Sequence, residues 1–143
     1  MTAALLALLL SVPQPFEARV IAVHDGDTIS VLQDARSLRL RLHGIDCPEL
    51  GQPFGRAAKK ETSALLFKRT VRVVPVGLDG YGRLVADVYL GSLLVNLELV
   101  RRGFAWHYTR YSRDAALAQA EREARSARRG LWADSVSYTH LRA

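Results

Sequence analysis

The sequence predicts an α+β fold, a partly open five-stranded β-barrel with about three α-helices packed on it. Three observations support this prediction. A β-meander pattern opens the chain, a helical pattern interrupts it, and a hairpin pattern follows before further helical patterns. The 143 residues fit one domain. The 49% of apolar residues suffice for a hydrophobic core.

The first three strands are expected before residue 43. Runs rich in Val, Ile and Leu are separated by turn residues. In the third run, leucines alternate with arginine and histidine, which is the period-2 pattern of a strand with one buried face. The predicted strands are 16–24, 28–32 and 38–42, with turns at 25–26 and 34–37.

The middle of the chain predicts a loop, a helix and two more strands. Apolar residues at helical spacing indicate the helix, and TVRVVP is typical of a strand. The expected order is a loop at 44–53, a helix at 54–68, a strand at 70–75, a loop at 77–82 and a strand at 83–90.

Two further helices are expected at 92–102 and 112–129. A serine begins each range, and serine is a preferred N-cap residue. Gly103 and Gly130 follow the two helices, and glycine commonly ends helices. A barrel with this order of elements suits the OB-fold, which commonly binds oligonucleotides. With no repeat or linker visible, residues 16–134 are predicted to form one domain.

The charge of the chain suggests its partners. The net charge is +6 and the pI is about 10.0. Such a charge fits nucleic acid first, an anionic membrane surface second, or merely a soluble surface. The single cysteine, Cys47, excludes an internal disulfide and a zinc site built from several cysteines. No apolar run approaches the ~18 residues that span a membrane.

Both ends of the chain differ from its middle. Residues 1–15 contain a short apolar run followed by SVPQP, which resembles the end of a secretory signal peptide, although a basic n-region is missing. The alternative is an apolar tail packed on the domain. A signal would make the protein secreted or periplasmic. Residues 135–143 have no periodicity and form an unplaced tail.

Two acidic clusters lie at the ends of predicted strands. One is HDGDT at 24–28 and the other is GIDCPE at 44–49. Each cluster alone is compatible with an ordinary turn. Together they flank one meander, so their carboxylates can converge, and hard cations such as Ca²⁺ need several oxygen ligands.

Arg41 and Arg83 are candidates for binding a phosphate group. The planar guanidinium binds phosphate oxygens in pairs and stays charged. By spacing alone, however, Arg41 does not differ from Arg39, and Arg83 is compatible with a simple turn residue. From spacing alone, the two arginines are therefore equally compatible with an ordinary solvated surface and with a phosphate-binding site.

Four segments together resemble the staphylococcal nuclease (thermonuclease) family. They are VIAVHDGDTISVL, RLRLHGIDCPE, the YGR at 81–83 and LVNLELVRRGFAW at 94–106. They occur in that family's order and near its spacing, over about 16–132. The resemblance implies a Ca²⁺-dependent nuclease that cleaves DNA and RNA and leaves 3′-phosphate ends.

The resemblance also assigns roles to single residues. It implies metal ligation by two carboxylates and one backbone carbonyl, a general base, two phosphate-binding arginines and tyrosines lining the nucleotide pocket. The implied metal ligands are the carboxylates of Asp27 and Asp46 and the backbone carbonyl of Cys47, and the implied general base is Glu49. The implied phosphate-binding arginines are Arg41 and Arg83, and the implied pocket residues are Tyr81, Tyr108 and Tyr111. The loop at 50–56 is shorter than in the best-known member, and Gly80 stands where that member has a lysine.

Two other functions compete with the nuclease. One is a non-catalytic OB-fold module that binds single strands through basic grooves and aromatic rings. The retained carboxylates and arginines argue against it. The other is a membrane-surface protein, which needs a helix with a deep apolar face. The last predicted helix is basic, but its apolar face is mostly alanine. A monomer is expected.

Overall fold

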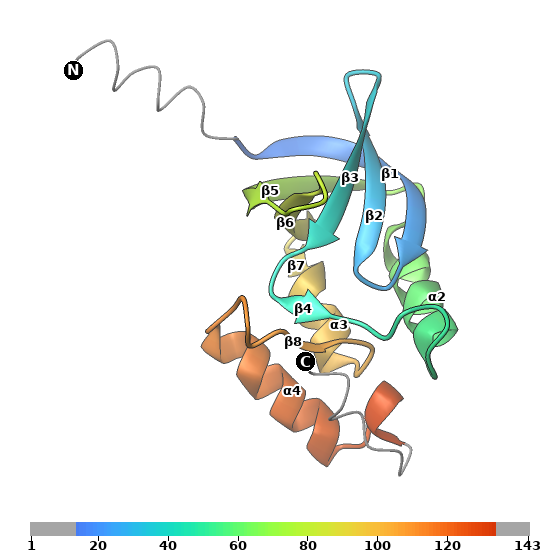
Figure 1. The fold of residues 1–143 in the computed structure, drawn as a ribbon, viewed down its shortest axis with the longest axis vertical. Helices are drawn as coiled ribbons and strands as arrows, with labels where there is room; N and C mark the ends of the chain where they lie inside the picture. Colours follow the sequence, from blue (N-terminus) through green and yellow to red (C-terminus); the bar gives the residue numbers. More distant parts are fainter. Residues whose placement is uncertain (1–13, 134–143) are drawn as a thin grey trace, which may run out of the picture.

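The computed structural model describes residues 14–133, and Figure 1 shows a β-barrel with helices beside and below it. The predicted α+β, OB-fold-type architecture is confirmed. The barrel strands are β1 (Phe16–Asp25), β2 (Thr28–Gln33), β3 (Arg36–Leu42), β5 (Thr70–Leu78) and β6 (Leu84–Leu90).

Strand pairing closes the barrel completely. The strands β3, β2, β1, β5 and β6 are neighbours in that order, and each of these neighbouring pairs is antiparallel. A parallel pairing of β3 with β6 then joins the two edges, with Leu40 opposite Leu84 and Leu42 opposite Ala86. The barrel is therefore closed rather than partly open, and its interior contains the fully buried side chains of Val20, Ile29, Leu40, Val73 and Val88.

Three α-helices accompany the barrel, as predicted. They are α2 (Gly55–Leu66), α3 (Val95–Arg101) and α4 (Ala115–Ser126), and a short 3₁₀ turn, η1 (Gly130–Ala133), follows. Helices α2 and α3 pack on strands of the barrel, and α4 packs on α3. Helix α2 buries Ala58, Thr62 and Leu66, which recur every four residues and so lie on one face. Helix α2 also requires glycine at its start, because a Cβ on Gly55 would lie 1.9 Å from the carbonyl oxygen of Glu49.

The two later helices begin differently from the prediction. Ser92 does not cap α3, because β7 (Leu93–Leu94) intervenes and pairs with β6. Asp114 caps α4, since its carboxylate accepts a hydrogen bond from the Ala116 amide at 2.8 Å. Gly103 does follow α3 in the left-handed region, at φ +83°.

A small second sheet replaces part of the predicted loop at 44–53. Strand β4 (Ile45–Asp46) pairs with β8 (Trp106–His107), which lies about sixty residues later in the chain. Strand β5 also continues through Leu78, beyond its predicted end. Local sequence patterns do not reveal either feature, because each depends on a partner strand supplied by the fold.

Two predicted segments lie almost wholly outside the described residues. The leader at 1–15 is described only at its last two positions, and the tail at 135–143 is not described at all. The predicted domain boundaries are therefore predictions still. Within residues 14–133, no helix is long and apolar enough to cross a membrane.

Candidate active site

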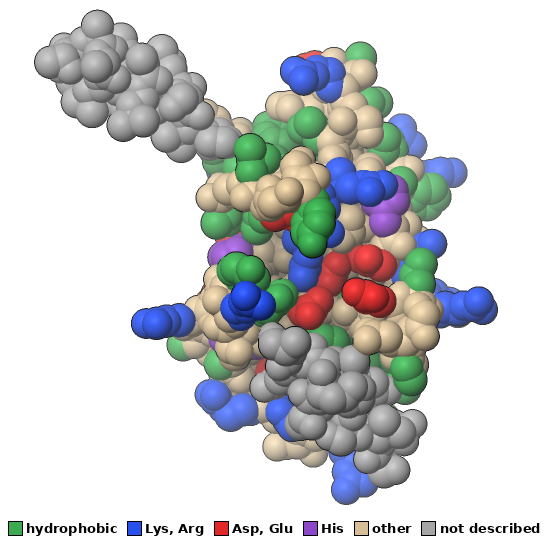
Figure 2. Space-filling view, in the orientation of Figure 1, with side chains coloured by type: hydrophobic (Ala, Val, Ile, Leu, Met, Phe, Trp, Pro, Cys, Tyr) green, Lys and Arg blue, Asp and Glu red, His purple; other side chains and the backbone are tan. Residues whose placement is uncertain are grey.

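The predicted site residues gather in one open cleft of about 830 Å³. Figure 2 shows acidic side chains at the centre of this face with basic side chains around them. The cleft is lined by all nine predicted residues, namely Asp27, Arg41, Asp46, Cys47, Glu49, Tyr81, Arg83, Tyr108 and Tyr111. The strand ends, β4 and the loops after β5 and β8 supply them.

The turn between β1 and β2 sets the position of Asp27. The Asp27 amide donates to the Asp25 carboxylate at 3.1 Å, and the Thr28 hydroxyl donates to the Asp27 carboxylate at 3.0 Å. Thr62 of α2 donates to the Gly26 carbonyl at 2.7 Å. A Cβ on Gly26 would lie 2.7 Å from the sulfur of Cys47, so only glycine fits this turn without displacing its neighbours.

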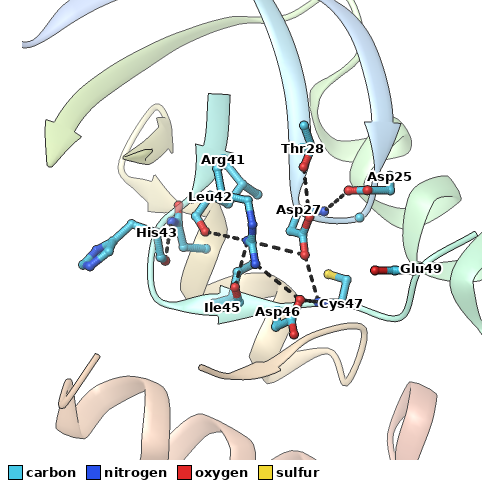
Figure 3. Close-up of polar contacts among 12 residues, drawn as sticks. Asp25, Asp27, Thr28, Arg41, Leu42, His43, Ile45, Asp46, Cys47 and Glu49 are labelled. Atoms are coloured by element: carbon cyan, nitrogen blue, oxygen red, sulfur yellow. Dashed lines mark hydrogen bonds and ion pairs between the residues drawn. The ribbon is translucent and has the colours of Figure 1, made fainter. Parts of the chain in front are cut away.

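One backbone amide brings the two aspartates together. The Cys47 N–H donates to Asp27 Oδ2 and to Asp46 Oδ1, each at 3.0 Å (Figure 3). The two carboxylates come from the β1–β2 turn and from β4. Cys47 makes these contacts through its backbone, and its side chain is buried. The size of that side chain therefore matters more than its chemical nature.

Arg41 lies between the same two carboxylates. Its Nη1 is 3.4 Å from Asp27 Oδ2, and its Nη2 is 3.3 Å from Asp46 Oδ1. The Nη1 atom also donates to the carbonyls of Ile45 at 2.9 Å and Leu42 at 3.1 Å (Figure 3). These contacts distinguish Arg41 from Arg39, which is exposed on the same strand.

Burial raises the pKa of both carboxylates. It raises the pKa of Asp27 well above its usual range, against the opposing effect of Arg41. It also raises the pKa of Asp46, and the charge of Glu49 adds to that rise. One guanidinium thus faces the buried carboxylate of Asp27 and the partly buried carboxylate of Asp46, which leaves a deficit of positive charge at this point of the cleft.

The donor atoms at this point fit a hard divalent cation. Carboxylate oxygens are the ligands that such ions prefer, and the charge deficit favours a cation. Within residues 14–133, however, no group of three or more His, Cys, Asp or Glu side chains is arranged to hold a metal ion. A metal here would therefore rely on two carboxylates, with backbone carbonyls and water completing its shell.

Asp79 positions the second arginine. Its carboxylate accepts the Nε of Arg83 at 2.6 Å and the amides of Tyr81 and Arg83 at 2.9 Å each. Burial opposes ionisation of Asp79, but these hydrogen bonds lower its pKa overall. Arg83 Nη1 lies 3.5 Å from the Thr28 hydroxyl. Asp79 was not among the predicted site residues, although an aspartate that begins a Gly-rich turn is a recognisable signal.

The remaining predicted residues lie at the rim of the cleft. Glu49 is exposed on the loop before α2, and Figure 3 places it beyond Cys47, away from Arg41. Tyr81 is 87% exposed and has the Arg83 guanidinium 5.3 Å from its ring centre. The rings of Tyr108 and Tyr111 meet edge to face, with centroids 5.0 Å apart.

Helix α4 supports the cleft from behind. The carboxylate of Glu121 accepts the backbone amide of His107 at 3.1 Å, and β8 carries Trp106 opposite Asp46 of β4. The α4 face that contains Leu117 is buried within the protein. That face is therefore occupied, and it does not favour binding to a membrane surface. Sequence reasoning missed Glu121, because a lone glutamate on a charged helix carries no signal.

The fold and the cleft define the class of the protein. Arginines and carboxylates converge in an open, basic-rimmed cleft on a small barrel, which is an arrangement suited to phosphoryl chemistry. The fold and site together therefore fit the class of enzymes that act on phosphodiesters.

Comparison with known proteins identifies the family. Residues 39–134 match the model of the "Staphylococcal nuclease homologue" family, so the chain belongs to the staphylococcal nuclease family, as the sequence predicted. Nucleases of this family are generally metal-dependent and act on nucleic acids. The match begins after Asp27, so the first predicted metal ligand lies outside it.

Several relatives are similar over most of this chain. An "Uncharacterized endonuclease" of Haemophilus influenzae is 42% identical over 82% of this chain and 66% of its own length. A "Micrococcal nuclease" of Shigella flexneri is 39% identical over 92% of this chain and 83% of its own. A "Probable staphylococcal-like nuclease CAN3" of rice is 36% identical over 80% of this chain but only 29% of its own length.

Proposed function

We propose that this protein is a Ca²⁺-dependent nuclease that hydrolyses phosphodiester bonds of DNA and RNA. The convergence of Asp27, Asp46, Arg41, Glu49 and Arg83 in one cleft carries this proposal. A non-catalytic binding module has no use for a buried and a partly buried carboxylate whose ionisation is unfavourable in the absence of a cation.

Asp27, Asp46 and the backbone carbonyl of Cys47 would hold the metal ion. When bound, Ca²⁺ supplies a Lewis acid that polarises a phosphate oxygen. The chain itself contributes two converging carboxylates, which the shared Cys47 amide keeps in place before any ion arrives. With only two carboxylates, the affinity is expected to be weak, with a Kd of ~10⁻⁴–10⁻³ M.

Glu49 would act as the general base. It lies at the edge of the acidic cluster on an exposed loop, so water reaches it freely. The loop is held by a reciprocal pair of contacts with Gln52, in which the Glu49 amide donates to the Gln52 side chain at 2.8 Å and the Gln52 amide donates back to the Glu49 carbonyl at 2.9 Å. A carboxylate in this position would orient and deprotonate the attacking water.

Arg41 and Arg83 would stabilise the charge that grows on the phosphate oxygens. Arg41 is held by the carbonyls of Leu42 and Ile45, and Arg83 by Asp79, so both are oriented before substrate binds. Preorganised donors are the most effective kind, and loss of one typically lowers the rate by ~10²–10³-fold. Tyr81, Tyr108 and Tyr111 would contact the nucleotide.

Two further properties belong to the same proposal. The protein is proposed to be secreted or periplasmic, because the apolar start of the chain resembles a signal peptide and weak Ca²⁺ binding suits an extracellular setting. It is also proposed to act as a monomer that leaves 3′-phosphate ends. N-terminal sequencing of protein from the periplasm and medium of an expressing host tests the first property, and an N-terminus that still begins at Met1 contradicts it.

The decisive experiment compares cleavage of single-stranded DNA and RNA by the wild-type protein and by Glu49→Gln. Each is assayed with Ca²⁺ and with EGTA, and metal-free binding is measured in parallel. Calcium-dependent cleavage that collapses in the variant is expected. Tight, salt-sensitive binding without cleavage by the wild type would instead favour the single-strand-binding module.

A further inference from the structure

A band of basic side chains borders the acidic centre of the cleft. We call it the basic track and define it as Arg39 of β3 with Arg56, Lys59 and Lys60 of α2. Figure 2 shows lysine and arginine side chains beside the acidic group on this face. None of these four residues belongs to the proposed catalytic set.

The α2 part of the track follows a second groove, which lies beside the loop that carries Glu49. The basic residues recur at helical spacing with Ser63 and Phe67, so they share one helix face. The groove is lined by Leu50, Gly51, Arg56, Lys59, Lys60, Ser63, Ala64 and Phe67. Leu50 of the groove directly follows Glu49 of the cleft, so the same loop borders both hollows.

Arg39 extends the track to β3, the strand that carries Arg41. It lies two residues before Arg41 and therefore on the same face of β3, ~7 Å along the strand. Ser30 lies opposite Arg39, and His24 contacts the Ser30 hydroxyl at 2.7 Å. Burial lowers the pKa of His24, and the positive charges of Arg39 and Lys59 lower it further against the opposing charge of Asp25, so both cations lie near this histidine.

The cations of the track have no acidic partner in the described part of the chain, since among residues 14–133 none of the four forms an ion pair. The only acidic residue of α2, Glu61, is paired with Arg102. Phe67 is 43% exposed at the far end of the groove. Uncompensated cations with an exposed aromatic ring are the features that bind a single strand of nucleic acid.

We propose that the basic track binds the phosphates of a single strand that extends beyond the nucleotides held in the cleft. The enzyme would then bind long single strands more tightly than short ones, and the track would raise affinity without taking part in the chemistry. The proposal rests on the proposed nuclease function and specifies its substrate class. Charge complementarity, the exposed ring of Phe67 and the loop that borders both groove and cleft select this partner.

The test uses paired variants that remove equal charge. Arg39→Gln/Lys59→Gln and Arg56→Gln/Lys60→Gln remove track charges, and Arg36→Gln/Arg122→Gln removes two exposed charges at the far end of β3 and on α4. Each is assayed with Ca²⁺ on thymidine oligonucleotides of about 4 and about 20 nucleotides. Binding of the longer one is measured in EGTA by fluorescence anisotropy at several salt concentrations.

Each track pair is expected to raise the KM for the long substrate about tenfold and to leave kcat and the short substrate unchanged. The slope of log K against log salt should weaken by about 1.4, at ~0.7 per lost phosphate contact. Equal effects on both lengths, or equal effects of the control pair, would overturn the proposal. If the wild type cleaves neither substrate, the nuclease proposal fails, while the anisotropy data still decide whether the track binds.

Discussion

The active cleft and the ion-pair network on α3 combine the same groups in opposite proportions. In the cleft, one arginine faces two carboxylates that are buried or partly buried. In the network, the buried Glu98 faces Arg101 and Arg102, and Arg102 also contacts Glu61 at 2.7 Å. In the cleft, the single arginine does not compensate the charges of both carboxylates. In the network, two arginines compensate the charge of the buried glutamate.

This difference sends the carboxylate pKa values in opposite directions. Hydrogen bonds from Arg101 and Arg102 lower the pKa of Glu98 to about 2, against the effect of burial. Burial raises the pKa of Asp27 and Asp46, because one guanidinium does not compensate for it. A carboxylate that is satisfied within the protein stabilises the fold, whereas one that is not satisfied is available for a ligand.

The largest expected effect is the loss of activity in Arg41→Gln. Its kcat with saturating Ca²⁺ should fall ~10²–10³-fold, because a preorganised charge in the cleft is removed. The matched change in the network, Arg102→Gln, should lower the melting temperature and leave kcat per folded molecule unchanged. Single-turnover cleavage and thermal melting measure the two effects. A fall in kcat below about tenfold in Arg41→Gln contradicts the role given to this arginine.

The network should make stability depend on pH. Because the pKa of Glu98 is lowered from 4.5 to about 2, its contribution is present above pH 4.5 and is lost as the pH falls towards 2. Its partners Arg101 and Arg102 are 51% and 38% exposed, so solvent screening reduces the contribution to about 1–2 kcal/mol.

Urea unfolding of wild type and Glu98→Gln across this pH range tests the contribution of the network. The two stability curves should converge at low pH, since both side chains are then neutral. Curves that stay parallel from pH 6 to 2.5 would show that the network does not stabilise the fold.

Calcium should stabilise the wild type and not Asp46→Asn. With a Kd of ~1 mM, about 10 mM Ca²⁺ adds about 1.4 kcal/mol to the free energy of unfolding. Without Ca²⁺, the variant should be at least as stable as the wild type near pH 7, because the folded state disfavours ionised Asp46. Denaturation with Ca²⁺, Mg²⁺ and EGTA measures both effects, and equal stabilisation of the two proteins argues against Asp46 as a ligand.

The smallest effect concerns the helix behind the cleft. Asp114→Ala removes the N-cap of α4 and should cost about 1 kcal/mol of stability, with activity unchanged. Asp114→Asn retains a capping side chain and serves as the control, with a loss of only a few tenths of a kcal/mol. Chemical denaturation separates the two variants. A destabilisation by Asp114→Asn as large as that by Asp114→Ala would show that the charge matters, and not the cap.

Much of the fold could be predicted because its signals are local. Alternating leucines predicted β3, helical spacing predicted α2, and Gly103 marked the end of α3. The N-cap of α4 was predicted two residues too early, because Ser112 and Asp114 are both capping residues and only the backbone path decides between them.

The candidate site could be predicted as a set of residues but not as an arrangement. Asp27, Asp46 and both arginines were identified through a resemblance of whole motifs, whereas Arg41 and Arg39 could not be distinguished by spacing. The supporting residues Asp79 and Glu121 were missed, because their importance lies in contacts with Arg83 and with β8.

The sequence alone determined which segments form strands and helices, because these depend on neighbours along the chain. It also determined the net positive charge and the residue types available for the cleft, because these follow from composition and motifs. Only the tertiary structure decided that β3 pairs with β6, that β4 pairs with β8, and that the Cys47 amide joins the two aspartates. Each of these contacts joins segments whose mutual fit depends on the whole barrel. The same geometry places one arginine against two carboxylates in the cleft. It thereby sets the pKa of each carboxylate, which depends on burial and on the distance to other charges.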